Sequence, residues 1–267
     1  MDIEKIKIIL LSVLAVGGMG VIFGALLSIA SKIFAVEKDE RIDKITECLP
    51  GANCGGCGFA GCGAAAEAIV NGEAKVNCCP VGGQEAATKI AEIMGVKAEK
   101  MEKMTAFVMC AGNHDNTRNR FKNNENIDCH TANRLAGGMK ECAYGCLGFG
   151  SCVKKCVFGA LSLQNGIAVV DRDKCTNCGT CMAECPRQII KRIPYSAKAA
   201  VECQSLAKGK DTKAACDAGC LGCTLCVKVC EFDAISVVDN CAVIDYEKCT
   251  GCGKCQEKCP RNIIKVI

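Results

Sequence analysis

The chain ends in a cysteine-rich run, "EKCTGCGKCQEKCPRNIIKVI" at residues 247–267, in which four cysteines stand two, two and three residues apart and a proline follows the last. Nearly the same string, "DKCTNCGTCMAECPRQIIKRI", occupies residues 173–193. The spacing C-x2-C-x2-C-x3-C-P is typical of proteins with two iron-sulfur clusters, in which the fourth cysteine binds the cluster that the first three do not. Each run therefore predicts a second cysteine group close to it in the fold.

The two runs belong to a larger internal repeat. Residues 129–193 fall on residues 203–267 without a gap when they are shifted by 74 positions, and nine cysteines coincide. In each copy the first cysteine group precedes a β-prone string with a central turn, at residues 160–171 and 234–245, which predicts a hairpin. The chain is therefore expected to contain two copies of one fold.

The second copy allows a crossed assignment of eight ligands, in which each cysteine group lends its last member to the other. The prolines after the lent cysteines of the two runs, Pro186 and Pro260, fix the backbone there. The two predicted ligand sets are Cys220, Cys223, Cys226 and Cys259, and Cys230, Cys249, Cys252 and Cys255.

The first copy departs from this pattern because Phe149 stands at the position of Cys223. Cys142 is expected to supply the missing ligand, and a three-iron cluster with fewer thiolates is the alternative. The two predicted sets are Cys142, Cys146, Cys152 and Cys185, and Cys156, Cys175, Cys178 and Cys181.

Another cysteine group precedes the repeat, at residues 47–83, and a helix is predicted within it from Cys62 to Val70. Residues 84–109 then carry a helical pattern that runs into an apolar stretch. Cys79 is a better fourth ligand than Cys78 because Pro80 follows it. Zinc is the alternative occupant, since a lone four-cysteine site suits both metals. The predicted ligands are Cys54, Cys57, Cys62 and Cys79.

Five sites of four leave seven of the 27 cysteines without a role. A sixth cluster bound by Cys110, Cys129, Cys203 and Cys216 is one hypothesis, and free buried thiols are the alternative. The remaining three are Cys48, Cys78 and Cys241.

Composition excludes several classes of protein. A disulfide scaffold is disfavoured because the cysteine count is odd and most cysteines stand in metal-type C-x2-C spacings. The formal charge of +4 treats as neutral the cysteines that metals bind as thiolates, and no basic stripe interleaved with aromatics suggests nucleic-acid binding. There is no G-x-G-x-x-G after a strand and no P-loop, so no flavin or NAD site is expected on this chain, nor any catalytic residue.

An uncharged stretch from Ile8 to Ser31 exceeds the roughly 20 residues that a membrane helix needs. It predicts a single span in the cell membrane, and a cleaved signal peptide is the weaker alternative. More basic residues follow the span than precede it, which places the remainder of the chain in the cytoplasm. These residues are Lys32, Lys38, Arg41 and Lys44 after the span, and Lys5 and Lys7 before it.

In this order of features the chain resembles the B subunit of the Rnf complex, in the long form of clostridia and related anaerobes. The resemblance rests on "LPGANCGGCGFAGCGAAAEAIVNGEA" at residues 49–74 and "CCPVGG" at residues 78–83, placed between a membrane span and tandem ferredoxin modules. The N-terminal motif alone is less specific, because corrinoid iron-sulfur proteins carry a similar one. The resemblance to the Rnf B subunit implies an electron relay in an ion-translocating ferredoxin:NAD+ oxidoreductase, with soluble ferredoxin and other Rnf-type subunits as partners.

The expected architecture is α+β, with five [4Fe-4S] clusters or six. The predicted domains are a membrane anchor, a small [4Fe-4S] module and two bacterial-type ferredoxin-like domains, at 1–35, 36–109, 110–197 and 198–267. A membrane-tethered polyferredoxin for a hydrogenase or formate dehydrogenase is the alternative function, and a zinc-stabilised scaffold is a third. Six basic residues could guide an acidic ferredoxin by long-range attraction: Lys154, Lys155, Lys174, Arg187, Lys191 and Arg192.

Overall fold

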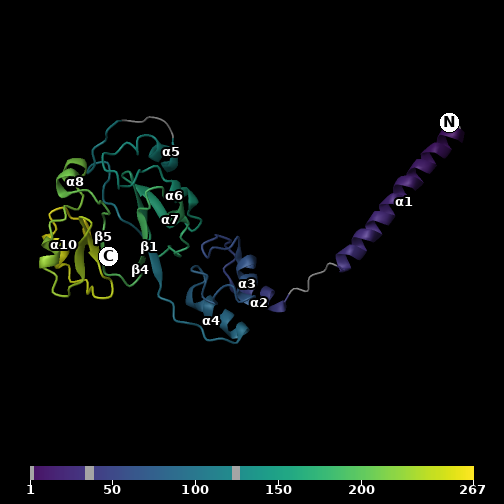
Figure 1. The fold of residues 1–267 in the computed structure, drawn as a ribbon, viewed down its shortest axis with the longest axis horizontal. Helices are drawn as coiled ribbons and strands as arrows, with labels where there is room; N and C mark the ends of the chain where they lie inside the picture. Colours follow the sequence, from purple (N-terminus) through teal and green to yellow (C-terminus); the bar gives the residue numbers. More distant parts are fainter. Residues whose placement is uncertain (1–2, 34–38, 122–126) are drawn as a thin grey trace. The chain divides into compact units, whose positions relative to one another are not determined.

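The structure is a computed structural model that describes residues 3–33, 39–121 and 127–267. It contains two compact units, Met1–Glu40 and Arg41–Ile267 (Figure 1). The first unit consists of helix α1 (Ile3–Ile33), in which Val13–Ser31 is long and apolar enough to cross a membrane. The predicted end of the anchor at residue 35 and the basic Lys38 lie outside the described residues.

The second compact unit, Arg41–Ile267, begins with a small helical module. Ile45, Ile69 and Ile90, one from each of its helices, are completely or almost completely buried and form its core. The helix predicted from Cys62 to Val70 is confirmed. The next helix ends well before residue 109, because Gly95 adopts the left-handed conformation that closes a helix. The helices are α2 (Glu40–Cys48), α3 (Cys62–Val70) and α4 (Gly83–Met94).

A first ferredoxin-like unit, residues 104–194, follows. Its strand β1 pairs antiparallel with β4, and β2 pairs antiparallel with β3. Strand β1 therefore belongs to this unit, although it precedes residue 110, where the domain was predicted to begin. Its elements are β1 (Met104–Val108), α5 (Cys129–Arg134), α6 (Ser151–Lys155), β2 (Leu161–Gln164), β3 (Ile167–Val170), α7 (Thr180–Glu184) and β4 (Ile190–Pro194).

A second ferredoxin-like unit, residues 199–267, repeats this arrangement, with β5 paired to β8 and β6 paired to β7. Together with the helices, these strands give the α+β fold predicted from the sequence. Its elements are β5 (Ala199–Val201), α8 (Gly209–Ala215), α9 (Leu225–Lys228), β6 (Ile235–Val238), β7 (Cys241–Ile244), α10 (Lys254–Lys258) and β8 (Ile264–Val266).

Both predicted hairpins are confirmed, and their turns explain the register. The two turn residues have positive φ angles in each hairpin, 46° and 77° at Asn165 and Gly166, and 48° and 67° at Asp239 and Asn240. Two-residue turns of this kind match the twist of the flanking strands and favour Asn, Asp and Gly.

Cysteines make up much of the core of each ferredoxin-like unit. Cys146, Cys152 and Cys181 are buried in the core of the first ferredoxin-like unit, among aliphatic side chains. Helices α6, α7, α9 and α10 each carry one cysteine and are only four or five residues long. Helices so short are not stable by themselves, so we expect the fold to depend on what the sulfurs bind.

Removal of iron should therefore unfold the two ferredoxin-like units more completely than the helical module. Metal binding contributes directly to folding in small metal-dependent domains, whereas α3 and α4 have 9 and 12 residues and share an isoleucine core. Hydrogen exchange after anaerobic chelation should show lost protection in β1–β8 and residual protection in α4, with untreated protein as the control. Protection of the strands that survives complete removal of iron would contradict this dependence.

Candidate iron-sulfur sites

The second ferredoxin-like unit brings its eight predicted ligands together in two groups. One cavity, site 2a, is lined by Cys220, Cys223, Cys226 and Cys259. Another cavity, site 2b, is lined by Cys230, Cys249, Cys252 and Cys255. Each group thus combines three cysteines of one run with the last cysteine of the other, as the crossed assignment predicts.

The first unit contains an equivalent of site 2b, named site 1b, made of Cys156, Cys175, Cys178 and Cys181. Burial and the nearby sulfurs of the other three together raise the pKa of the Cys181 thiol to about 12. Two of the sulfurs accept backbone hydrogen bonds, Cys175 from the Ala106 N–H at 3.4 Å and Cys156 from the Ala160 N–H at 3.4 Å. The four predicted ligands therefore lie together.

The equivalent of site 2a in the first unit, named site 1a, differs from the expectation. Its cavity is lined by Cys129, Cys146, Cys152 and Cys185, so the structure places Cys129 rather than Cys142 in this group. Cys129 is the first residue of α5, and its N–H donates to the Ser151 Oγ at 3.0 Å. The carboxylate of Asp128 caps the same helix by accepting from the Thr131 N–H at 2.6 Å.

Phe149 occupies the sequence position that Cys223 holds in the second copy. It packs against α5, the helix that carries Cys129. Its half-buried side chain packs against a small cluster of Cys129, Ala132 and Leu147. An aromatic ring thus contacts α5, and α5 brings in the cysteine that the first copy lacks at position 149.

Backbone hydrogen bonds show that Cys110, rather than Cys129, is the structural counterpart of Cys203, although the gapless 74-residue shift pairs Cys129 with Cys203. The Met109 N–H donates to the Ile189 carbonyl at 2.9 Å, and the Glu202 N–H donates to the Ile263 carbonyl at 2.7 Å. Since Ile189 and Ile263 are equivalent under the 74-residue shift, the cysteines that follow the two donors, Cys110 and Cys203, are equivalent in the fold.

The same equivalence extends to the sulfurs. Cys110 Sγ accepts from the Cys146 N–H at 3.4 Å, and Cys203 Sγ accepts from the Cys220 N–H at 3.3 Å. Cys110 and Cys142 are 32 residues apart, while their counterparts Cys203 and Cys216 are 13 apart. The first copy therefore contains 19 additional residues in this interval, which carries α5.

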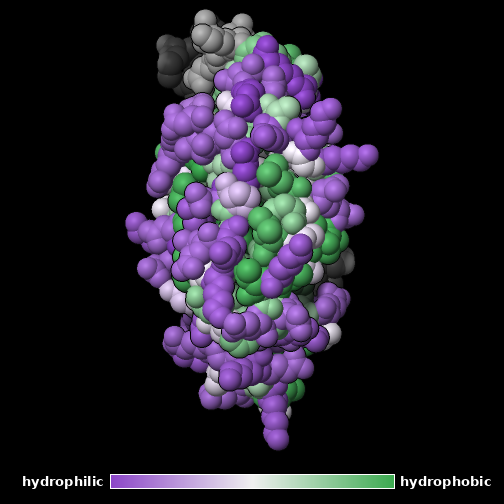
Figure 2. Space-filling view, turned by 90° about the vertical axis from the view of Figure 1, so that its left-hand side faces the viewer, coloured by the Kyte–Doolittle hydropathy of each residue, from purple (hydrophilic) through white to green (hydrophobic). Residues whose placement is uncertain are grey.

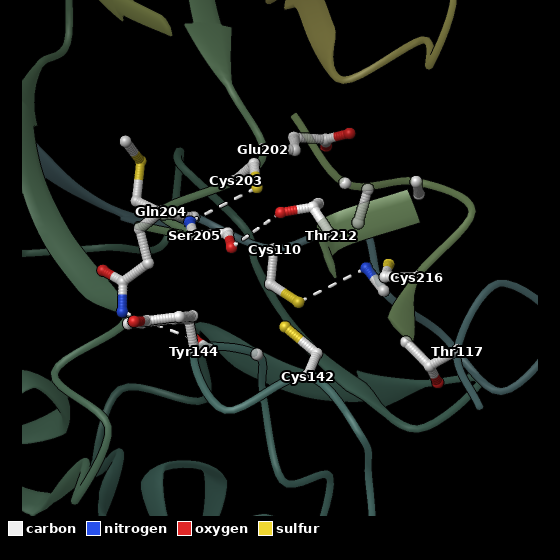
Figure 3. Close-up of a pocket in the computed structure, with 16 residues that line it drawn as sticks. Cys110, Thr117, Cys142, Tyr144, Glu202, Cys203, Gln204, Ser205, Thr212 and Cys216 are labelled. Atoms are coloured by element: carbon white, nitrogen blue, oxygen red, sulfur yellow. Dashed lines mark hydrogen bonds between the residues drawn. The ribbon is translucent and has the colours of Figure 1, made fainter. Parts of the chain in front are cut away.

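A further cavity lies between the two ferredoxin-like units and is named the bridging site (Figure 3). The hypothesis of a sixth cluster placed Cys129 there, but the structure places Cys142 there instead. Cys129 and Cys142 thus exchange sites relative to the sequence-based assignment. The cysteines that line the bridging site are Cys110, Cys142, Cys203 and Cys216.

The helical module brings three of its predicted ligands, Cys57, Cys62 and Cys79, close together near the start of α3. The pKa of Cys79 is raised by burial and by the nearby sulfurs of Cys57 and Cys62, and its Sγ accepts from the Gly82 N–H at 3.3 Å. Burial and the sulfurs of Cys57 and Cys79 raise the pKa of Cys78 to about 11. Both thiols thus lie near the sulfur of Cys57, but only that of Cys79 also lies near Cys62, which favours Cys79 as the fourth ligand. We name the group Cys54, Cys57, Cys62 and Cys79 the N-terminal site.

The N-terminal site lies directly against site 1b. A Cβ atom on Gly56 would stand 2.3 Å from the Cys178 carbonyl oxygen, so only glycine permits this approach of the two backbones. Gly56 lies between Cys54 and Cys57, and Cys178 belongs to site 1b. Two groups that are far apart in sequence are therefore neighbours in space.

The donor set fits iron-sulfur clusters better than single metal ions. A zinc ion with metal–sulfur bonds of about 2.3 Å would draw four sulfurs to about 3.8 Å from one another. Within residues 3–33, 39–121 and 127–267, no group of three or more His, Cys, Asp or Glu side chains is arranged to hold a single metal ion. All-cysteine groups with backbone N–H donors to sulfur are typical of iron-sulfur sites.

Substitution of Gly56 by alanine should separate the N-terminal site from site 1b, because the added methyl group cannot fit against the Cys178 carbonyl. We expect G56A to keep its iron content but to lose magnetic coupling between the two reduced clusters in EPR spectra. Gly63 is the matched control, since a Cβ atom there meets no atom within 4 Å. Equal coupling in G56A, G63A and the parent protein would show that the contact is not needed for this proximity.

Comparison with known proteins gives matches in the same regions. The family described as "Putative Fe-S cluster" matches residues 49–81, which include the whole N-terminal site. The family described as "4Fe-4S binding domain" matches residues 168–191 and 242–265, the terminal run of each copy. The chain therefore contains iron-sulfur domains in the helical module and in both ferredoxin-like units.

Relatives of known name match almost the whole chain. The B subunit of a Na+-translocating ferredoxin:NAD+ oxidoreductase complex from Acetobacterium woodii is 44% identical over 257 residues, 96% of this chain and 77% of that protein. The B subunit of an ion-translocating oxidoreductase complex from Methanosarcina acetivorans is 44% identical over 97% of this chain and 99% of its own length. The corresponding protein of a proton-translocating ferredoxin:NAD+ oxidoreductase complex from Clostridium ljungdahlii is 43% identical over 93% and 89%. The chain therefore belongs to the family of B subunits of Rnf complexes, the ion-translocating ferredoxin:NAD+ oxidoreductases.

Proposed function

We propose that this chain accepts electrons from reduced soluble ferredoxin in the cytoplasm and relays them toward the other subunits of its membrane complex. As a member of this family, the chain is an electron-transfer subunit of such a complex. The observation that carries the proposal is the sequence of contacts among cysteine groups in one compact unit. When bound, [4Fe-4S] clusters supply one-electron carriers whose potentials depend on hydrogen bonds to sulfur, local charge and exposure.

We propose as ligands five groups of four cysteines outside the bridging site. Four of these groups are those predicted from the sequence, and in the fifth, site 1a, Cys129 replaces Cys142. The ligands are Cys54, Cys57, Cys62 and Cys79; Cys129, Cys146, Cys152 and Cys185; Cys156, Cys175, Cys178 and Cys181; Cys220, Cys223, Cys226 and Cys259; and Cys230, Cys249, Cys252 and Cys255.

Neighbouring groups share contacts that keep them close. Gly56 joins the N-terminal site to site 1b, as described above. Within the first unit, the pKa of Cys152 in site 1a is raised to about 12 by burial and by nearby sulfurs, among them that of Cys181 in site 1b. Sites 2a and 2b contribute cysteines to a single core in the second unit. This continuity supports a relay rather than a set of independent sites.

The second ferredoxin-like unit provides the surface on which we propose that a protein partner docks. Among the 27 cysteines, all of which lie within the described residues, only Cys223 and Cys252 are exposed. Cys178, the counterpart of Cys252, is covered by the Gly56 loop. Figure 2 shows an apolar patch surrounded by hydrophilic side chains on the face that lies at the left of Figure 1, where α8 and α10 are found. An apolar centre with a polar rim is the usual composition of a protein interface.

Of the six basic residues considered as guides for ferredoxin, Lys154, Lys155, Lys191 and Arg192 are exposed and suit long-range attraction. Lys174 is also exposed, but it forms an ion pair with Asp171 at 3.3 Å. Arg187 does not suit this role, because it is half-buried and donates to the Gly137 carbonyl.

The cytoplasmic orientation rests on the excess of Lys and Arg after the membrane-spanning segment. In this arrangement the flavin and NAD sites belong to other subunits. An alternative partner, a hydrogenase or formate dehydrogenase, would leave the cysteine groups unchanged and would alter only the enzyme that co-purifies.

Anaerobic purification of the complex tests the function. We expect the chain to co-purify with flavin-containing subunits and ferredoxin:NAD+ activity, to be reduced by ferredoxin, and to contain at least about 20 irons and 20 sulfides per chain. Co-purification with a hydrogenase or formate dehydrogenase without NAD+ reduction would identify the alternative function. A colourless, iron-free chain would indicate the zinc-stabilised scaffold.

A free cysteine of the second unit is placed to adjust the potential of site 2a. The thiol of Cys241 donates to the Cys203 carbonyl oxygen at 3.3 Å and lies beside the sulfurs of Cys203 and Cys220. Its proximity lowers the pKa of Cys203 to about 7 and that of Cys220 to about 6. The same interactions raise the pKa of Cys241, so it remains a neutral donor. Ile167 occupies the equivalent position in the first copy and has no donor.

Replacement of Cys241 by alanine should lower the reduction potential of site 2a, because the lost donor stabilises the more negative reduced form. A net hydrogen-bond contribution of about 0.5–1.5 kcal/mol corresponds to a shift of roughly 20–60 mV for one electron. Redox titration followed by EPR measures this shift. C241S is the matched control, since its hydroxyl keeps the donor, and equal potentials in C241A and C241S would exclude this role of the thiol.

A further inference from the structure

The bridging site contains four cysteines that the five proposed clusters do not use. Each ferredoxin-like unit contributes two of them, and all line the same cavity (Figure 3). Cys110, Cys203 and Cys216 are buried, and Cys142 is half-buried. The electrostatic influence of Cys142 and Cys203 on the thiol of Cys216 also shows that sulfurs from both units approach one another.

The two pairs are the same pair taken from the two copies. Cys142 and Cys216 are equivalent under the 74-residue shift, and Cys110 and Cys203 are equivalent by their backbone hydrogen bonds. Each of Cys110 and Cys203 also accepts from the N–H two residues later, from Gly112 at 3.3 Å and from Ser205 at 3.5 Å. The repeat therefore presents two matching thiol pairs to one cavity. This arrangement suits an iron-sulfur core that is bound by four thiolates.

Two glycines of the first unit leave space beside these sulfurs. A Cβ atom on Gly112 would stand 3.4 Å from Cys110 Sγ and 3.4 Å from Cys216 Sγ. A Cβ atom on Gly145 would stand 3.4 Å from Cys142 Sγ and 3.7 Å from Cys110 Sγ. Three of the four sulfurs, from both units, are therefore grouped around backbone that carries no side chain.

A buried cation provides an independent sign of an anionic occupant. Lys140 is only 5% exposed, and its ammonium group donates to the carbonyls of Gly112 at 2.7 Å and Gly166 at 3.1 Å. Among the described residues it has no carboxylate partner within ion-pair distance. A buried charge is costly unless it is paired, and the negative groups it can reach are the sulfurs of Cys110 and Cys146, whose charged forms it favours.

We infer that the bridging site holds a sixth [4Fe-4S] cluster through Cys110, Cys142, Cys203 and Cys216, and that Lys140 offsets part of its negative charge. The inference rests on the proposed relay function and completes it. The Cys146 N–H bonded to Cys110 Sγ connects the bridging site to site 1a, and the Cys220 N–H bonded to Cys203 Sγ connects it to site 2a. The cluster would thus join the two ferredoxin-like units.

Iron and sulfide counts on the anaerobically purified complex test the inference. The parent chain should contain about 24 irons, and C110A/C203A, which removes two ligands of the bridging site, should contain about 20. C48A, a cysteine outside all six groups, is the control and should keep about 24. A parent chain with about 20 irons, or no loss in C110A/C203A, would overturn the sixth cluster while leaving the five-site relay intact.

A third substitution in the C110A/C203A variant tests which cysteines share the site. C142A should cause no further loss, because Cys142 belongs to the cluster that is already absent. C129A should cause further loss of iron, because it removes a ligand of site 1a. The opposite result would assign Cys129 to the bridging site and overturn the ligand set inferred here.

Lys140 allows a second measurement in a chain that keeps all its cysteines, in case the alanine variants do not assemble. K140M should keep about 24 irons and shift the potentials of the bridging site and site 1a to more negative values. K213M, which changes an exposed lysine of α8, should shift neither potential. Unchanged potentials in K140M would show that no charged cluster lies beside this ammonium group.

Discussion

The bond between cysteine sulfur and iron is the interaction on which we expect the two ferredoxin-like units to depend. Their helices are four to seven residues long, their sheets have two strands each, and sulfur atoms fill much of the space where larger apolar side chains usually pack. A small core of cysteines and a few aliphatic side chains buries too little apolar area to hold such short elements alone. The helical module is different, because its longer helices bury three isoleucines against one another.

The sequence predicts the fold well wherever one local pattern determines the structure. The C-x2-C-x2-C-x3-C-P runs predict both ferredoxin-like units, Asn165–Gly166 and Asp239–Asn240 predict the hairpin turns, and the alanine-rich stretch predicts α3 with its observed ends. The sequence is less informative where distant residues meet. Strand β1 has no local signal that it pairs with β4, and no spacing predicts that Gly56 touches Cys178.

The exchange of Cys129 and Cys142 has a specific cause. A gapless shift pairs Cys129 with Cys203, whereas the hydrogen bonds of the fold pair Cys110 with Cys203. The 19 additional residues of the first copy carry Cys129 on α5 to the place that Phe149 leaves without a thiol. The sequence shows that site 1a lacks one ligand, since Phe149 breaks the cysteine pattern. Only the three-dimensional structure identifies Cys129 as the cysteine that compensates.

The two copies have diverged around their shared ligands. The first has Lys140 and Ile167 where the second has Ala214 and Cys241, so a buried cation and a thiol donor each act in one copy only. Sites with the same ligands thus have different surroundings, and surroundings set the potential of a cluster. Duplication followed by such changes is a simple route from two equal carriers to a graded series.

The exposure of Cys223 and Cys252 also has a consequence for survival in air. Dissolved oxidants react first with the cysteine sulfurs they can reach, and the exposed cysteines belong to sites 2a and 2b of the second ferredoxin-like unit. Aerobic damage should therefore begin at the proposed docking surface and proceed inward, so that brief exposure to air inactivates this surface before the interior groups are lost.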